Sequence, residues 1–160
     1  MAENPYWRDE HALHDTLNGD NMILCPWVLK KGDKEGIAAV VWFGRATRGH
    51  PKVVHGGLTS LVFDDLFGTC LYMGECVSMD AVVVTAYLKV DYRAALPCET
   101  AVLVTSGVDK VEGRKIYLRA AMTNLDGTKL YAEASALFIV PRAEAEVAAA
   151  VFSATASTGK

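Results

Sequence analysis

Hydrophobic residues recur every three or four positions over one long stretch near the middle of the chain, Leu58–Tyr72. The stretch contains no proline and is long enough for about four helical turns. Two glycines, Gly56 and Gly57, come immediately before it. The pattern predicts one long helix that begins after this glycine pair.

Segments rich in β-branched and aromatic residues lie on both sides of this helix, two before it and four after it. We expect strands at Met22–Lys31, Gly36–Gly44, Ala81–Arg93, Thr100–Val111, Lys115–Leu125 and Lys129–Val140. Glu112-Gly113 and Asp126-Gly127 separate the last three segments and are typical of tight hairpin turns. The last four strands are therefore expected to form an antiparallel meander, with the helix across the concave face of the sheet.

The two ends of the chain carry weaker patterns. Residues Pro5–Leu17 suit a short amphipathic helix, and the alanine-rich residues 144–152 predict another turn or two of helix. With 160 residues, 51% of them hydrophobic and 22% charged, the chain has the size and composition of one globular domain. We interpret residues 1–160 as a single domain, with a core over residues 20–141, an N-terminal helix over 5–17 and a tail over 142–160.

Charge and apolar runs narrow the choice of partners and compartment. The formal net charge of -3 provides no general attraction for nucleic acid. No apolar run approaches the roughly 20 residues needed to cross a bilayer. The acidic start of the chain resembles neither a secretory signal nor a mitochondrial presequence. We therefore expect a cytoplasmic protein, with a mitochondrial location as the alternative if a presequence precedes these residues.

Cysteines and common motifs exclude several kinds of chemistry. The cysteines are Cys25, Cys70, Cys76 and Cys98. They show no paired spacing, so we expect reduced thiols and no metal. No phosphate-binding glycine loop, dinucleotide fingerprint or nucleophile elbow is present, which disfavours kinases, dehydrogenases and the common serine hydrolases. His11 and His14 on an exposed N-terminal helix and His50 in a loop are weaker candidates for a functional role than His55.

The segment His55–Asp65 holds the strongest candidate chemistry. Glycines at the start of a helix let a ligand approach and leave first-turn N–H groups free to bind a developing negative charge. On a helical wheel Asp64 shares a stripe with Gly57 and Leu61, on the surface expected to face the sheet or a partner subunit. A half-buried carboxylate is costly unless it is paired or used. Alternatively, Asp64 and Asp65 mark the polar side of the helix, and periodicity alone does not decide.

Polar and basic residues after the helix offer further candidates. Alternation places one row of side chains on the same face of the strand: Thr85, Tyr87, Lys89, Asp91 and Arg93. Such a row is typical of a solvated face, but Thr85 lies at the apolar start, where a hydroxyl suits holding a water or a carboxylate. Lys110, Arg114 and Lys115 flank the Glu112-Gly113 turn. Singly they are surface charges, and together with Arg93 they are candidates for holding phosphates.

The sequence His55-Gly56-Gly57, followed by a helix with Asp64 as the tenth residue of the segment, resembles hotdog-fold acyl-coenzyme A (CoA) thioesterases. The further stretches that carry the resemblance are Val84–Arg93, Leu96-Pro97, Val108–Lys115 and Leu130–Ile139. The resemblance covers about residues 50–140. Over these residues the sequence is similar to the thioesterase superfamily branch that includes the carboxy-terminal modulator protein and phenylacetate-pathway thioesterases. It implies an α+β hotdog fold, in which a curved antiparallel sheet wraps a long central helix.

The resemblance also implies an activity and roles for residues. The activity is hydrolysis of fatty or aryl acyl-CoA to free acid and CoA in fatty acid metabolism, with no cofactor beyond CoA itself. Asp64 would act as general base or nucleophile, and the Gly57 backbone N–H would polarise the thioester carbonyl. His55 and Thr85 would place water and shape the site. The residues implied for CoA binding are Asp91, Arg93, Arg114 and Lys115. Each site would lie between subunits of a homodimer or dimer of dimers (homotetramer).

Some features depart from the family pattern, and other functions stay open. Asp91 stands where an amide is common, and the connection from Tyr72 to Val82 is longer than in relatives.

The apolar slot for the acyl chain is expected from Leu58, Leu61, Phe63, Phe67 and Leu71. The main alternative is an acyl-CoA-binding sensor or scaffold that does not hydrolyse its ligand. A hydratase, which needs a close Asp/His pair, and a purely structural module are the other two.

Overall fold

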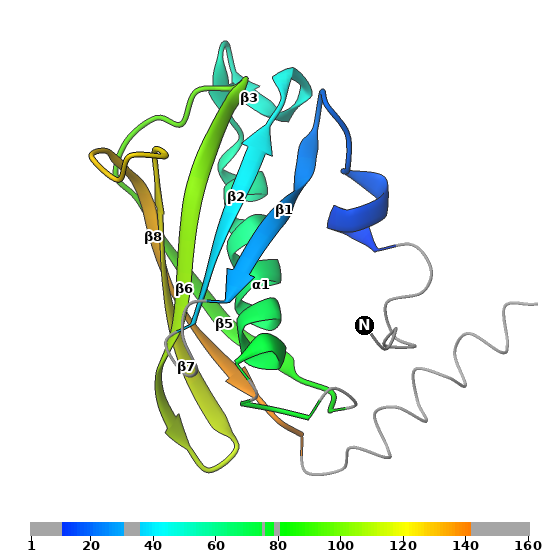
Figure 1. The fold of residues 1–160 in the computed structure, drawn as a ribbon, viewed down its shortest axis with the longest axis vertical. Coiled ribbons are helices and arrows are strands. Elements are labelled where there is room, and N and C mark those ends of the chain that lie inside the picture. The colour runs from blue at the N-terminus through cyan, green and yellow to red at the C-terminus, as the bar shows by residue number, and fades with distance from the viewer. Residues whose placement is uncertain (1–10, 31–35, 75, 79–80, 142–160) are drawn as a thin grey trace, which may run out of the picture.

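A six-stranded antiparallel sheet curls around one long helix (Figure 1). The structure is a computed structural model that describes residues 11–30, 36–74, 76–78 and 81–141. Its helical elements are the π-helical turn η2 (Ala12–Thr16), the 3-10 turn η3 (Arg45–Thr47) and the α-helix α1 (Gly56–Met73). Its strands are β1 (Ile23–Lys30), β2 (Ile37–Phe43), β3 (Arg48–His50), β4 (Val53–Val54), β5 (Val84–Tyr92), β6 (Thr100–Glu112), β7 (Lys115–Thr123) and β8 (Leu130–Ile139). The predicted helix and all six predicted strands are confirmed.

The strand order of the sheet is β1-β2-β6-β7-β8-β5. The predicted meander is correct for β6, β7 and β8, whose turn glycines Gly113 and Gly127 have positive φ angles of 59° and 75°. It is wrong for β5, which pairs with β8 instead of β6. The reason lies in the link after β5: Leu96 and Cys98 hydrogen-bond to the segment around β4, and the Glu99 N–H bonds to the end of β2. These bonds carry the chain across the end of the sheet.

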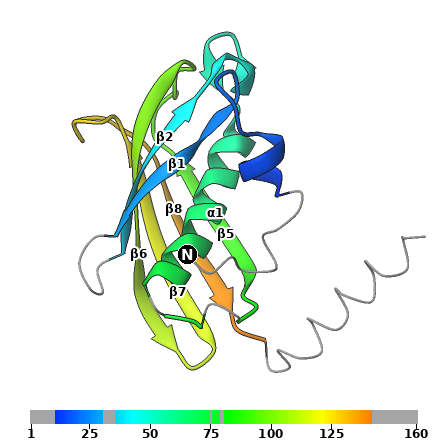
Figure 2. The ribbon, with the colours of Figure 1, turned by 45° about the vertical axis from the view of Figure 1, so that its right-hand side comes forward.

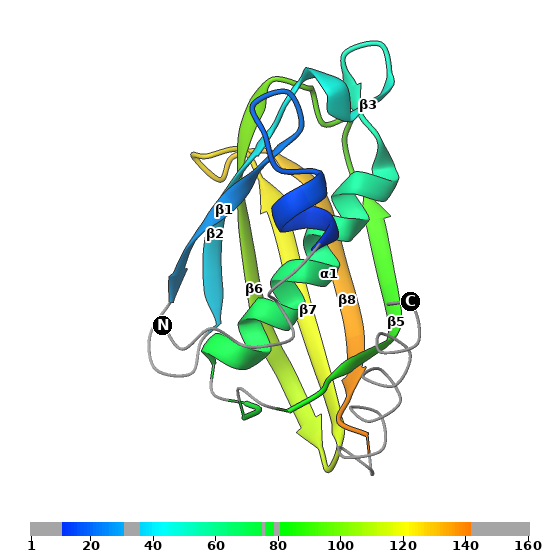
Figure 3. The same cartoon turned by 90° about the vertical axis from the view of Figure 1, so that its right-hand side faces the viewer.

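The helix α1 lies across the concave face of the sheet in all three views (Figures 1 to 3). It begins at Gly56, two residues earlier than predicted, because His55 caps it and draws both glycines into the first turn. At the other end the Gly74 N–H bonds to the Cys70 carbonyl at 2.9 Å. Because the helix begins at Gly56, the glycine pair belongs to its first turn.

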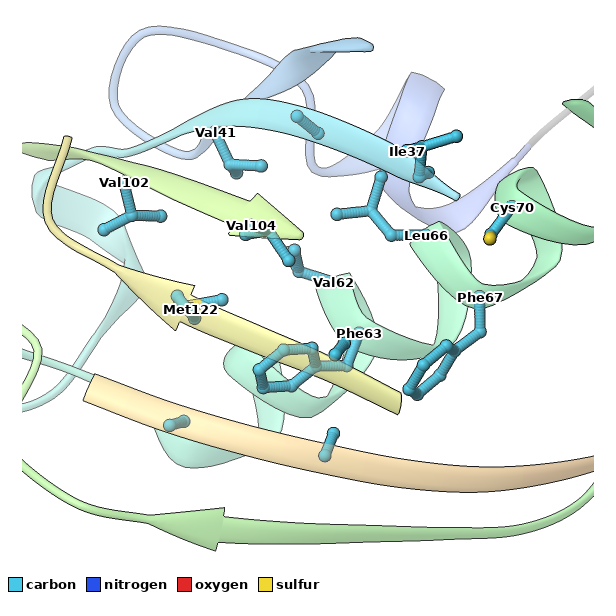
Figure 4. Packing of buried hydrophobic residues seen from close by; sticks show 14 of the residues in the cluster. Ile37, Val41, Val62, Phe63, Leu66, Phe67, Cys70, Val102, Val104 and Met122 are labelled. Carbon is cyan, nitrogen blue, oxygen red and sulfur yellow. The ribbon is translucent and has the colours of Figure 1, made fainter. Parts of the chain in front are cut away.

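The core fills the space between α1 and the sheet (Figure 4). Phe67 is central: its ring packs on Phe63 at a centroid distance of 6.5 Å and meets Phe138 of β8 edge-on at 6.3 Å. Of the predicted acyl slot, Phe63, Phe67 and Leu71 are fully buried core residues, whereas Leu58 and Leu61 are partly buried. The buried stripe of α1 lies beside the predicted stripe, so Asp64 falls at its margin.

Segments outside the main sheet differ from the sequence-based expectation. In its described part, the helix predicted over 5–17 is a single turn, η2. The Leu13 side chain of this turn is buried in the core. The predicted loop over 45–52 contains the turn η3 and the short strand β3. The helix predicted over 144–152 lies outside the described residues. Within the described part of the chain, no helix has both the length and the apolar character needed to cross a bilayer.

Candidate active site

The start of α1 carries a side-chain cap. The Nδ1 atom of the exposed His55 accepts a hydrogen bond from the Gly57 N–H at 3.0 Å. This N–H, the donor implied for the thioester carbonyl, is therefore engaged by the chain itself. Gly56 is the first helical residue, and within the described part of the chain its N–H makes no hydrogen bond. The helix thus presents one unused backbone donor beside one that His55 covers.

Tyr92, at the end of β5, is a site residue that the sequence did not single out. Its hydroxyl donates to the Gly56 carbonyl at 2.7 Å and lies 2.8 Å from the Ser60 hydroxyl. A methyl group added at Gly56 would come within 3.1 Å of this hydroxyl. Tyr92 therefore holds the first turn of α1 against the end of β5. In the sequence, alternation places Tyr92 on the strand face opposite the row of polar side chains, and this was the signal that could have identified it.

Asp64 and Thr85 form the central polar contact. The Thr85 hydroxyl donates to Oδ1 of Asp64 at 3.0 Å, joining the middle of α1 to the start of β5. Asp64 is half-buried and Thr85 is exposed. A carboxylate in this position has one oxygen fixed and the other available to accept a proton. The expectation that the Thr85 hydroxyl could hold a carboxylate agrees with this geometry.

A β-bulge turns Thr85 toward the helix. Thr85 pairs with Phe138 and Tyr87 with Leu137, so Ala86 is an extra residue in β5. The extra residue breaks the alternation, and the prediction that Thr85 shares a face with Tyr87, Lys89 and Asp91 is wrong for that reason. The bulge gives Thr85 the same orientation as its neighbour Phe138, whose ring packs under α1.

The carboxylate and the N–H groups lie far apart within one chain. Asp64 follows Gly57 by seven positions, which is about 10 Å along a helix axis. A base and an oxyanion donor must both come within about 3 Å of the reacting atoms. Within one chain, Asp64 and the N–H groups of the glycine pair therefore do not meet at one point.

The residues implied for CoA binding are exposed or half-buried, and most are paired. Lys89 Nζ lies 2.9 Å from Asp91 Oδ2, and this hydrogen bond lowers the pKa of Asp91 below its ordinary value. The Arg93 guanidinium donates to the Glu133 carboxylate, with Nε at 3.0 Å from Oε1. Arg114 donates to the Val140 carbonyl at 3.0 Å, and Lys115 is exposed at the start of β7. Arg93 and Asp91 are thus partly neutralised by neighbours.

These basic residues do not converge within one chain. Val84 and Lys115 both pair with Ile139 of β8, so Arg114 and Lys115 lie level with the start of β5 but on the other side of β8. Arg93 follows the opposite end of β5, where its N–H bonds to Tyr131. The nine residues of β5 extend over roughly 30 Å.

The surface of the described chain has a cavity and a groove near the candidate residues. A cavity of about 420 Å³ opens beside Gly56 between α1 and the end of β5, and is lined by apolar residues such as Val54, Leu96 and Ala132. A larger, open groove of about 720 Å³ runs along the outer face of the sheet past Tyr117 and Arg119. Of the candidate residues Gly56, Gly57, Asp64 and Thr85, only Gly56 lines the smaller cavity, and none of the four lines the groove.

The structure also brings together three residues that the sequence did not connect. Asp65 has only 5% of its side chain exposed, and its Oδ1 lies 3.2 Å from His14 Nε2 and 3.6 Å from His11 Nε2. The hydrogen-bonding contact with Asp65 raises the pKa of His14 above its ordinary value, against partial burial, which lowers it. The prediction that His11 and His14 are exposed is wrong, because η2 packs against α1; His50 is exposed as expected.

Solved structures share this architecture. Zebrafish thioesterase superfamily member 2 aligns with a TM-score of 0.61 at 19% identity, over 71% of this chain and 80% of that chain. A hypothetical thioesterase from Streptococcus pneumoniae, solved with coenzyme A, aligns with a TM-score of 0.60 at 15% identity, over 73% of this chain and 89% of that chain. The fold, a long helix wrapped by a curled antiparallel sheet, is therefore the hotdog fold, as the resemblance implied.

Sequence comparisons identify the family. The model of the thioesterase superfamily matches residues 51–131, and the chain belongs to this superfamily. Mouse acyl-coenzyme A thioesterase THEM4 is 38% identical over 96 residues, which cover 60% of this chain and 39% of that protein. An uncharacterised protein of Schizosaccharomyces pombe is 27% identical over 148 residues, covering 88% of this chain and 82% of that protein. The chain thus spans about two fifths of the mouse relative's length.

Substitution of His55 tests the cap at the start of α1. His55→Ala removes the acceptor of the Gly57 N–H and is expected to lower the free energy of unfolding by about 1 kcal/mol, because that donor loses its protein partner. His55→Asn, which supplies another capping oxygen, is expected to recover most of this loss. Urea denaturation measures both. Equal stability of the alanine variant and the wild type would contradict the capping role.

Proposed function

We propose that this chain is an acyl-CoA thioesterase that acts as a homodimer, or as a dimer of such dimers. Membership of the thioesterase superfamily and the similarity to proteins named acyl-coenzyme A thioesterase support the reaction class. The observation that carries the proposal is the contact between Thr85 and the half-buried Asp64. A carboxylate held at the margin of an apolar core by a hydroxyl is suited to remove a proton from water at a thioester.

The chemistry assigns a separate task to each half of the site. Asp64 activates water, or attacks the thioester carbon directly, while Thr85 keeps the carboxylate oriented. Attack places negative charge on the carbonyl oxygen. Fixed N–H groups at the positive end of a helix stabilise that charge where it develops. The glycine pair at the start of α1 supplies these donors, from Gly56 directly and from Gly57 once His55 turns aside. When water attacks, Asp64 returns the proton to the departing CoA thiolate; when Asp64 attacks directly, CoA leaves first and water then hydrolyses the mixed anhydride to the free acid.

The exposed edge of the sheet supports a site shared by two chains. Among the strands that the structure describes, β5 pairs only with β8, and Val84, Tyr87 and Tyr92 are 42%, 48% and 54% exposed along it. An unpaired edge strand is a template for a second strand. The Asp64–Thr85 contact lies at the start of β5 and the glycine turn at its end. Two-fold antiparallel pairing of β5 with its copy would therefore place the two halves of the site side by side.

The same pairing supports CoA binding at the subunit boundary. Arg93 at the end of β5 would approach the partner's Arg114 and the partner's Lys115, which lie level with the start of that strand. Phosphates of CoA could then meet cations from both chains. The acyl group requires apolar surface near the oxyanion donors, and the cavity of about 420 Å³ beside Gly56 offers it. Fatty and aryl acyl groups are the substrates that this lining favours.

Loss of the Asp64 charge is the direct test of the reaction. We expect Asp64→Asn to slow the release of free CoA thiol by at least about 100-fold, because the amide is no base. Thiol release is followed with a colour reagent on acetyl-, medium-chain, long-chain and phenylacetyl-CoA. The control is Asp20→Asn, the same change at an exposed side chain outside α1, which should retain wild-type rates. Full activity of a folded Asp64→Asn protein would contradict the mechanism, and tight acyl-CoA binding without thiol release would favour the sensor.

A proline at the first helical position tests the backbone donor. Gly56→Pro removes the N–H without disturbing the helix, because proline suits this position and His55 before it is already extended, with φ -64° and ψ 128°. We expect a loss of about 10²- to 10³-fold in kcat. Gly56→Ala is the matched control, since it crowds Tyr92 with the same Cβ but keeps the N–H. Equal rates for the proline and alanine variants would exclude Gly56 as the donor.

A further inference from the structure

His11, His14 and Asp65 form a compact cluster away from the Asp64–Thr85 contact. The two histidines belong to the N-terminal turn around η2, which lies beside α1 on the side that the sheet leaves open (Figure 3). Asp65 belongs to α1 and is separated from His14 by about fifty residues in sequence. One possible ligand atom from each of the three residues lies within 4.8 Å of the other two.

The spacing of these atoms suits ligands that share an ion. His14 Nε2 and His11 Nε2 lie 3.2 Å and 3.6 Å from the same Asp65 oxygen. Charge-assisted hydrogen bonds are typically about 2.7–2.9 Å long, so the His14 contact is a long hydrogen bond and the His11 contact is longer still. Ligands about 2.0–2.1 Å from a tetrahedral zinc ion are instead separated from each other by about 3.4 Å. The observed distances lie on either side of that value.

The carboxylate itself shows a second, independent feature. Asp65 is 5% exposed, and its Oδ2 atom is buried without a hydrogen-bond partner in the part of the chain that the structure describes. A buried carboxylate oxygen without a partner is costly, and such atoms are rare in folded proteins. A cation bound to the carboxylate would offset this cost. Two imidazoles and one carboxylate, with water in the fourth position, form a donor set that zinc accepts.

We propose that His11, His14 and Asp65 bind a divalent cation of the zinc class, which fastens the N-terminal turn to α1. Zinc binding changes the His11 ring. Its Nδ1 accepts hydrogen bonds from the N–H groups of Leu13 and His14 at 3.3 Å and 3.2 Å, so its Nε2 carries the ring proton. Coordination through Nε2 moves that proton to Nδ1 and gives up both bonds. The affinity is therefore expected to be lower than that of a dedicated structural zinc site.

The test uses the full chain after treatment with a chelator. We expect micromolar ZnCl₂ to raise the melting temperature and calorimetry to give one Zn²⁺ per chain. Both signals should disappear in Asp65→Asn and in His14→Gln, which keep side chains of similar size. His50→Ala, which removes an exposed histidine outside the cluster, should retain them. If one of these two cluster variants does not fold, the other alone is enough for the test.

Cobalt separates this cluster from the cysteines. Co²⁺ bound to histidine and carboxylate gives visible d–d bands without the near-ultraviolet band of a thiolate ligand, and we expect this spectrum in the wild type. Absence of binding by calorimetry, or Zn²⁺ binding of equal strength in Asp65→Asn, would overturn the proposal. In either case the cluster would be an ion pair only. A thiolate band would also overturn the proposal, because it would place the ion at a cysteine.

Discussion

The hydrogen bond from Thr85 to Asp64 connects the middle of the central helix to the strand at the edge of the sheet. It exists because Ala86 is an extra residue in β5, which turns the Thr85 side chain from the outer face to the helix. Without this bulge, Asp64 would lie half-buried at the margin of the core and lose this hydroxyl partner. One irregularity in one strand therefore decides whether this half-buried carboxylate has a hydroxyl partner that orients it.

The geometry of α1 sets the second constraint. A carboxylate at mid-helix and N–H donors at the helix start are separated by about 10 Å, so one chain cannot apply both to one carbonyl. β5 runs between these two places, and one of its edges pairs with no other strand in the described part of the chain. The strand that carries Thr85 at one end and Tyr92 at the other is thus also the strand through which a second chain would complete the site. Under the proposed function, catalysis and assembly depend on the same segment.

Local patterns in the sequence predicted the helix, the strands and the turn glycines, because each depends on neighbouring residues; the role of Asp64 stays a prediction. The place of β5 at the edge was missed, because it depends on hydrogen bonds between the 94–99 link and strands far away in sequence. The orientation of Thr85 was missed because a bulge reverses an alternation that otherwise holds. The burial of His14 was missed because its partner, Asp65, lies about fifty residues later.

The most direct test of a site shared between subunits is complementation by subunit exchange. Chains carrying Asp64→Asn and chains carrying Gly56→Pro are each expected to be inactive alone. After random exchange about half of the dimers are mixed, and each mixed dimer regains one intact site, so thiol release should reach about a quarter of the wild-type rate. The account would be contradicted if the two tagged chains co-purified as mixed dimers and thiol release did not recover.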